Sequence, residues 1–155
     1  MYTGNIISEI LCSHGRSPRL DFHAENELQG TFPQWLAEME VAYIILPDNR
    51  LIGSLPPALF HSHSLWLLAL SKNNFSGELP KNIGDANFLR ILMLAGNNFS
   101  GPIPPSTSQI PNLQVLDLSR NRFSGNTFPV FDPQGLLISL PTTLRRGSNR
   151  VFSIH

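Results

Sequence analysis

The sequence predicts a solenoid in which short repeats stack into a parallel sheet on a concave face, with turns and short 3-10 helices on the convex face. Three observations predict this fold. Asparagines recur at a constant interval along the chain, apolar residues stand at fixed places before each one, and a glycine follows each at a fixed distance. A unit this short cannot bury its own apolar side chains, so successive units must stack and share one core.

The strand of each repeat is expected just before the asparagine. Apolar residues stand eight, five and three positions ahead of it, and the last two flank one intervening residue, as in a strand with one buried face. In chain order these residues are Val41, Ile44 and Leu46; Leu65, Leu68 and Leu70; Leu89, Leu92 and Leu94; Leu113, Leu116 and Leu118.

The framing asparagines are Asn49, Asn73, Asn97 and Asn121, and the interval between neighbours is the same each time. A side-chain amide both donates and accepts hydrogen bonds. We therefore expect a structural asparagine ladder that satisfies buried backbone groups where the chain leaves each strand.

The second half of each repeat carries turn signals. An apolar residue stands two positions after the asparagine, and a glycine at plus four allows a positive φ or a close backbone approach. In three repeats a proline at plus seven follows leucine or isoleucine, which fixes φ and favours an extended path into the convex side.

The order N-x-F-S-G-x-L/I-P resembles the plant-specific leucine-rich repeat of receptor-like proteins, receptor kinases and polygalacturonase-inhibiting proteins. The phrases NNFSGELP, NNFSGPIP and LQVLDLSRNRFSG are most similar to the ectodomain of a plant receptor-like protein, and the resemblance covers roughly residues 3–130. It implies a leucine-rich repeat solenoid of the α/β horseshoe type, mostly β. It also implies a signal peptide, cysteine-bearing caps, many repeats and a membrane anchor, which the sequence itself does not display.

The expected organisation is a solenoid over residues 1–130, regular over about 41–130, followed by a degenerate partial repeat and irregular tail over 131–155. A glycine column that reaches back to Gly4 indicates a start inside a repeat. In the tail, Leu140-Pro141 is interpreted as the Leu-Pro pair of a further unit. Its framing position would then be Gln134, little more than half a unit after Asn121, so nearly half a unit is expected to be missing.

Two irregularities are expected within the repeats. One residue too many stands between Leu20 and Asn26, which predicts a bulge or an irregular strand there. Pro47 lacks the N–H of a ladder donor, so we expect it to weaken one rung of the sheet.

The candidate binding surface is the concave face, onto which residues between the buried strand positions point. This face is apolar with a polar rim, as expected of a contact surface for a peptide or protein. The candidate residues are Tyr43, Ile45, Trp66, Leu67, Lys72, Arg90, Ile91, Met93, Gln114, Val115, Asp117 and Arg120. Strand propensity alone also favours apolar residues at such positions.

Two sequons, Asn74-Phe75-Ser76 and Asn98-Phe99-Ser100, stand in equivalent places just after the asparagine turn. They predict glycosylation at Asn74 and Asn98 and agree with an extracellular origin. Because N-F-S is part of the repeat motif, the two sites count as one observation.

Several functions lack the residues they need. The formal net charge is zero and basic residues cluster no further than pairs such as Arg145-Arg146, so binding to nucleic acid has no support. Cys12 is the single cysteine, so the chain has no internal disulfide and no thiol pair for a metal. His61 and His63 of the segment His61-Ser62-His63 have no carboxylate or cysteine at the spacing of a third metal ligand. No catalytic signature, cofactor motif or apolar run long enough to span a membrane is found, so we expect neither an enzyme nor a cofactor or metal site.

The favoured function, implied by the resemblance, is recognition of a peptide, glycan or protein partner by a plant cell-surface receptor-like protein in defence or developmental signalling. A co-receptor kinase is a further expected partner. The parent location is extracellular or at the cell surface, although the N-terminal residues do not resemble a secretory signal. Two alternatives remain: an inhibitor of secreted cell-wall hydrolases, and a truncated, non-functional gene product.

Overall fold

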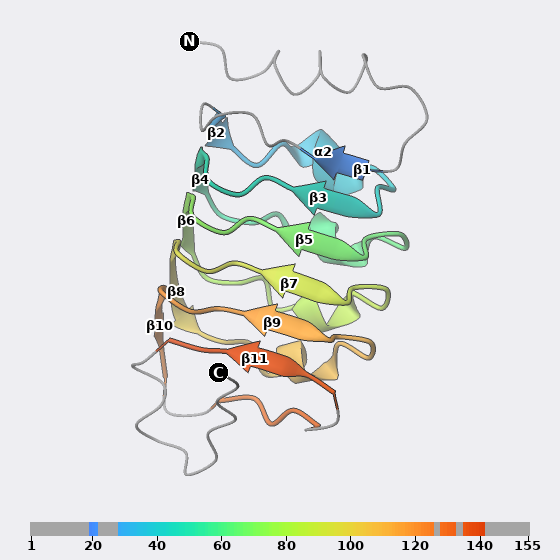
Figure 1. Cartoon of the computed structure of the whole chain (residues 1–155), viewed down its shortest axis with the longest axis vertical. Helices are drawn as coiled ribbons and strands as arrows, with labels where there is room; N and C mark the ends of the chain where they lie inside the picture. The colour runs from blue at the N-terminus through green and yellow to red at the C-terminus, as the bar shows by residue number, and fades with distance from the viewer. Residues whose placement is uncertain (1–18, 22–27, 126–127, 133–134, 142–155) are drawn as a thin grey trace.

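The computed structural model describes residues 19–21, 28–125, 128–132 and 135–141. In this part, the chain coils so that each of the first four turns contributes a strand to one parallel sheet, a strand to a second sheet and a short helical turn (Figure 1). The prediction of a leucine-rich repeat solenoid is confirmed. The predicted start within a repeat, at Gly4, lies outside the described residues.

The first sheet contains the four strands that the apolar pattern predicts before the framing asparagines, with one further strand at each end. Its strands, in spatial order, are β1 (Arg19–Asp21), β3 (Tyr43–Ile45), β5 (Leu67–Ala69), β7 (Ile91–Met93), β9 (Val115–Asp117) and β11 (Leu137–Ser139). All neighbours pair in parallel, and equivalent positions of successive repeats stand side by side. The middle residue of each strand from β3 to β9 is fully buried, as the alternation requires.

The second sheet was not predicted. It consists of β2 (Gln29–Thr31), β4 (Arg50–Gly53), β6 (Asn74–Gly77), β8 (Asn98–Pro102) and β10 (Arg122–Ser124), also parallel. In the second-sheet strands β4, β6, β8 and β10, the apolar residue at plus two points inward. Phe75, Phe99 and Phe123 stack there, with ring centroids 6.0 and 6.2 Å apart and planes within 8° of parallel. The glycines at plus four all have positive φ, between 73° and 112°.

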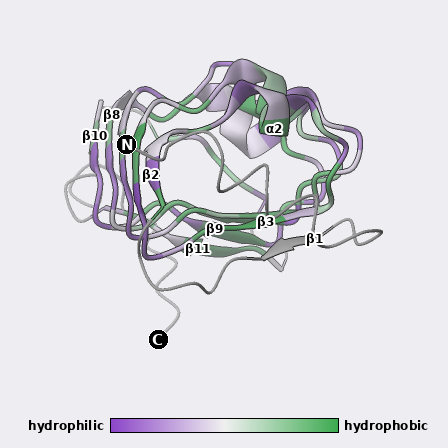
Figure 2. Ribbon diagram, turned by 90° about the horizontal axis from the view of Figure 1, so that it is seen from above, coloured by the Kyte–Doolittle hydropathy of each residue, from purple (hydrophilic) through white to green (hydrophobic). Residues whose placement is uncertain are grey.

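Helical turns close the remaining side of the coil, opposite the first sheet (Figure 2). They are α2 (Gln34–Glu38) and the 3-10 turns η1 (Pro57–His61), η2 (Ile83–Asp85) and η3 (Pro105–Gln109). A proline at the first helical position of η1 and η3 needs no N–H partner there and sets the helical φ. Leu59, Phe60 and Ile83 of these turns are buried in the core that they share with the two sheets.

The asparagine ladder joins each repeat to the one before it. The Nδ2 of Asn97 donates to the carbonyl oxygens of Leu94, in its own repeat, and of Leu70, in the preceding one, at 3.1 and 2.9 Å. Its Oδ1 accepts from the backbone N–H of Phe75 at 3.1 Å. Asn73 and Asn121 make the same three contacts with their own neighbours.

The residue just before each framing asparagine has a left-handed backbone. Asp48, Lys72 and Arg120 have φ of 55°, 56° and 53°, and Gly96 in the same column has 69°. The N–H groups of Asp48, Lys72 and Gly96 donate to carbonyls of the following repeat, as when Lys72 donates to the carbonyl of Ala95 at 2.8 Å. The turn therefore keeps one residue of each repeat in the left-handed region, which is strained where that residue is not glycine.

Pro47, which was expected to weaken one rung, leaves the bonds of its strand to the following repeat in place; the segment of the preceding repeat that it would face lies outside the described residues. It lies after the end of β3, and the N–H groups on either side of it, of Leu46 and Asp48, donate to the carbonyls of Ala69 and Ser71 at 2.8 and 3.0 Å. The carbonyl of Leu46 accepts from the side chain of Asn73. A proline at this position costs no bond to the following repeat, because alternate N–H groups of a parallel strand face opposite neighbours.

The expected frame of the last unit was wrong. Leu137 pairs with Val115 and Ser139 with Asp117, so Leu140-Pro141 takes the place of Leu46-Pro47. The interval from Val115 to Leu137 is only slightly shorter than that from Ile91 to Val115, so β9 and β11 belong to consecutive units and no half-unit is lost between them.

The irregularity expected near the start is described only in part. Leu20 pairs with Ile44 in regular register. The rest of the bulge expected before Asn26 lies outside the described residues.

Candidate functional site

The side chains of the first sheet that point away from the core form two rows across its strands, which we call the open face. The first row is apolar: Tyr43, Leu67, Ile91, Val115 and Leu137. The second becomes polar toward β11: Ile45, Ala69, Met93, Asp117 and Ser139. The parallel register therefore brings together equivalent residues of successive repeats, including every strand residue predicted for this surface.

Leu137 and Ser139 are residues of the open face that the sequence prediction missed. The misplaced frame of the last unit assigned them to a degenerate tail. Leu137 is nevertheless 48% exposed, which extends the apolar row by one strand.

One edge of the open face is formed by the residues that precede the strands. Trp66 stands next to β5, where its ring lies against that of Tyr43, with centroids 5.6 Å apart and planes at 53°. Arg90 and Gln114 occupy the same place beside β7 and β9, and their N–H groups donate to the carbonyls of Trp66 and Arg90. The tilted Trp-Tyr pair offers a large, rigid apolar surface next to polar side chains.

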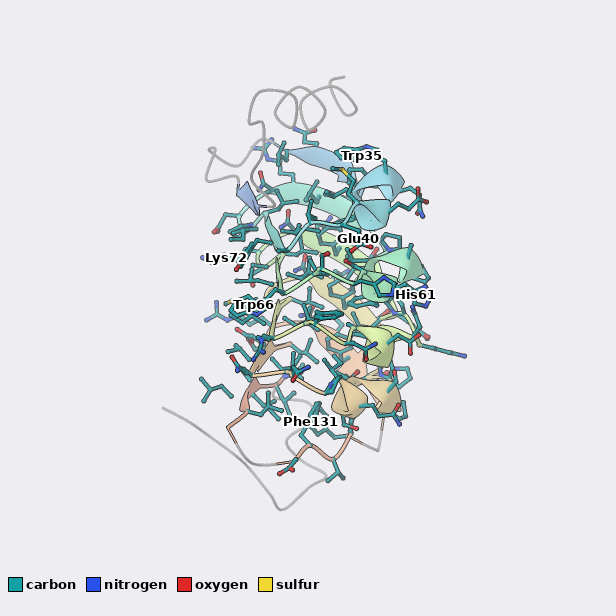
Figure 3. All side chains as sticks on the ribbon, turned by 90° about the vertical axis from the view of Figure 1, so that its right-hand side faces the viewer. Trp35, Glu40, His61, Trp66, Lys72 and Phe131 are labelled. Atoms are coloured by element: carbon teal, nitrogen blue, oxygen red, sulfur yellow. The ribbon has the colours of Figure 1, made fainter. Side chains whose placement is uncertain are left out.

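The opposite edge carries charges held by the left-handed turn. Lys72 and Arg120 are exposed there, and the ammonium group of Lys72 lies 3.3 Å from the Asp48 carboxylate. Figure 3 shows Lys72 and Trp66 on the side of the first sheet and His61 among the helical turns on the other side. Asp117, on the face itself, accepts from the N–H and hydroxyl of Ser119 at 3.1 and 2.7 Å.

The two sequon asparagines do not lie on the open face. Asn74 begins β6 and Asn98 begins β8, both in the second sheet. Asn74 is exposed and Asn98 is half-buried.

The two histidines considered as a metal clip have separate carboxylate partners. His61 lies 3.3 Å from Asp85 in the following repeat, and His63 lies 3.8 Å from Glu40 in the preceding one. Among the described residues, no group of three or more histidine, cysteine, aspartate or glutamate side chains is placed to hold a metal ion. The helices in that part of the chain are all too short or too polar to cross a membrane.

Comparisons with known proteins agree with this architecture. The family model described as Leucine Rich Repeat matches residues 88–110 and 112–133. No curated protein matches the chain. The fold and the repeat pattern define a leucine-rich repeat protein of the plant type, whose architecture is generally that of a binding scaffold and not of an enzyme.

Solved structures similar to the chain include ectodomains of plant receptor kinases. The ectodomain of the Arabidopsis receptor kinase HAESA, in complex with an IDA peptide hormone ligand, is 32% identical over 76% of this chain, with a TM-score of 0.69. That of GASSHO1/SCHENGEN3 from Arabidopsis thaliana, in complex with CASPARIAN STRIP INTEGRITY FACTOR 2, is 32% identical over 68%, with a TM-score of 0.64. A chain of the BIR3–SERK2 complex from Arabidopsis thaliana is 28% identical over 80%, with a TM-score of 0.65.

The chain thus resembles the ectodomains of plant membrane receptor kinases. It spans only part of them: 21% of the HAESA chain, 13% of the GASSHO1/SCHENGEN3 chain and 72% of the chain in the BIR3–SERK2 complex.

Proposed function

We propose that the chain is a recognition segment of a plant cell-surface receptor-like protein and that a peptide or protein ligand binds along its open face. The observation that carries the proposal is the continuous apolar row from Tyr43 to Leu137, one side chain from each of five neighbouring strands. An apolar strip at the surface bordered by polar residues is typical of a contact surface. The peptide-bound HAESA ectodomain supports a peptide as the ligand class.

The ligand would lie across the strands, so that each repeat contacts one short stretch of it. Trp66 and Tyr43 are the proposed anchor at the end nearer β3, because aromatic side chains dominate binding energy in such interfaces. Toward β9 the open face carries Asp117, and Arg90 and Arg120 belong to its two edges. These charged side chains would select and orient polar groups of the ligand.

The proposal assigns binding to this chain and no catalysis. Signalling would depend on a partner such as a co-receptor kinase, and the location would be extracellular. The BIR3–SERK2 structure supports association with a second receptor chain.

Peptide selection tests the proposal while the ligand is still unidentified. The 155-residue chain, secreted with an added leader, would be panned against a phage-displayed library of random peptides. Selected peptides would then be titrated against the wild type and Ile91→Asp. We expect affinity to fall at least about tenfold in the variant, because the bound peptide would bury the new carboxylate without a partner.

The matched control is Ser124→Asp, which adds the same charge at an exposed position of the second sheet. It should leave peptide affinity within about twofold of the wild type, a difference well under about 1 kcal/mol. Failure to select any peptide, or equal loss in both variants, would argue against recognition by the open face.

A further inference from the structure

The second sheet displays both sequons on its outer surface. Successive side chains of a strand point to opposite sides, so the asparagine and serine of each N-F-S share one side and the phenylalanine takes the other. Phe75 and Phe99 are fully buried in the core. Asn74 with Ser76, and Asn98 with Ser100, therefore face outward from β6 and β8.

The sequon amides differ from those of the ladder one residue earlier. Asn73 and Asn97 use Nδ2 and Oδ1 to bind backbone groups of two repeats. Within the part of the chain that the structure describes, the side chains of Asn74 and Asn98 have no hydrogen-bond partner. Their amide nitrogens are free for chemistry that does not disturb the fold.

The outer surface of the second sheet also leaves room for a bulky group. This sheet forms a different side of the coil from the first sheet, so a glycan there would project away from the open face (Figure 2). A large polar group would therefore be compatible with ligand binding by the first sheet.

We propose that Asn74 and Asn98 carry N-linked glycans, with Asn74 the preferred site. Asn74 is exposed, whereas Asn98 is half-buried and pairs in register with Ser76 of β6. In the modification, the amide Nδ2 forms a bond to C1 of a lipid-linked oligosaccharide. The bond from C1 to the lipid pyrophosphate breaks, and the amide nitrogen loses one proton. The inference rests on the extracellular location in the proposed function.

The test expresses the full chain in plant cells with an added secretory leader and maps glycopeptides by mass spectrometry. Both the secreted and the cell-retained chain are measured, before and after enzymatic removal of glycans. We expect a glycan on Asn74 at higher occupancy than on Asn98. Asn74→Gln and Ser76→Ala should each remove the Asn74 glycan and leave that of Asn98.

A gain-of-site variant tests whether the place on the sheet matters. Arg122→Asn creates a third N-F-S sequence with Phe123 and Ser124, at the equivalent position of β10. It should add one glycan. A chain that enters the secretory pathway with Asn74 unmodified, or with Asn98 more highly occupied than Asn74, would overturn the proposal. The peptide selection tests the open face independently of this result.

Discussion

Thr107 places a hydroxyl where the two preceding repeats place Leu59 and Ile83. Its side chain is fully buried in η3, and its Oγ1 has no hydrogen-bond partner among the described residues. Thr107→Val removes this hydroxyl and keeps the shape, so we expect the free energy of unfolding to rise by about 1 kcal/mol. The melting temperature should rise by roughly 2–4 °C, measured by calorimetry.

The control for this prediction is Thr31→Val, which makes the same change at an exposed position of β2. It should alter stability by less than about 0.5 kcal/mol. A Thr107→Val variant no more stable than this control would show that the hydroxyl is satisfied in solution.

Glu40 is an exposed carboxylate that holds the loop of the next repeat. The hydrogen bond from the Ser64 side chain is the main cause that lowers the pKa of Glu40; burial opposes it, and the backbone N–H and charge of His63 and the Ser62 hydroxyl lower the pKa further. A carboxyl whose pKa is lowered on folding stabilises the fold above its unfolded-state pKa, and this contribution is lost as the pH falls through the folded pKa. The stability difference between wild type and Glu40→Gln should therefore shrink in the acidic range below the ordinary glutamate pKa, as followed by urea unfolding at several pH values. A difference unchanged over that range would contradict this role.

At the scale of the element, the asparagine turn is the joint between successive repeats. Asn97→Ala leaves the N–H of Phe75 without its partner and removes one of the two side-chain amides that donate to each of the carbonyls of Leu70 and Leu94, which keep Asn73 and Asn121 respectively. We expect a loss of about 2–4 kcal/mol in the free energy of unfolding, measured by denaturant titration. The adjacent Asn98→Ala is the matched control and should change stability by less than about 0.5 kcal/mol, because its amide has no partner among the described residues. Equal effects of the two substitutions would contradict the ladder.

The strands of the first sheet could be predicted because their sequence signal is redundant. Three apolar positions and one asparagine recur in four repeats, and each has one physical role that the structure shows. The rows of the open face follow directly from that register. The fold was therefore accessible from the pattern alone wherever the asparagines keep their constant interval, from Asn49 to Asn121.

Other elements gave too little signal. A second-sheet strand buries a single apolar residue at plus two, which does not distinguish a strand from a turn. Lysine and arginine have no preference for the left-handed region, so Lys72 and Arg120 did not reveal it, and only Gly96 and, more weakly, Asp48 in the same column agree with it. The position of the last unit was predicted wrongly for two reasons. The interval from Val115 of β9 to Leu137 of β11 is shorter than the interval between the earlier strands, and a Leu-Pro pair occurs in both halves of the repeat.

At the scale of the whole molecule, each described repeat pairs its strands with those of its immediate neighbours. The sheets order their strands strictly by repeat, so stability should be distributed along the coil as in a one-dimensional array. Inner repeats have two neighbours and the end strands β1 and β11 have one within the described residues. Hydrogen exchange should therefore be slowest for the backbone amides of β5 and β7.

Equivalent substitutions in two repeats test this coupling. Leu92 and Leu116 are both fully buried at the centre of β7 and β9, and truncation of either to alanine should cost about 2–5 kcal/mol locally. Leu116→Ala should speed amide exchange in β9, β10 and β11 and leave β3 and β5 protected. Leu92→Ala, at the centre, should speed exchange on both sides, because it separates the repeats that stabilise each other. If both variants lost protection uniformly from β3 to β11, the chain would unfold as one unit and the array description would fail.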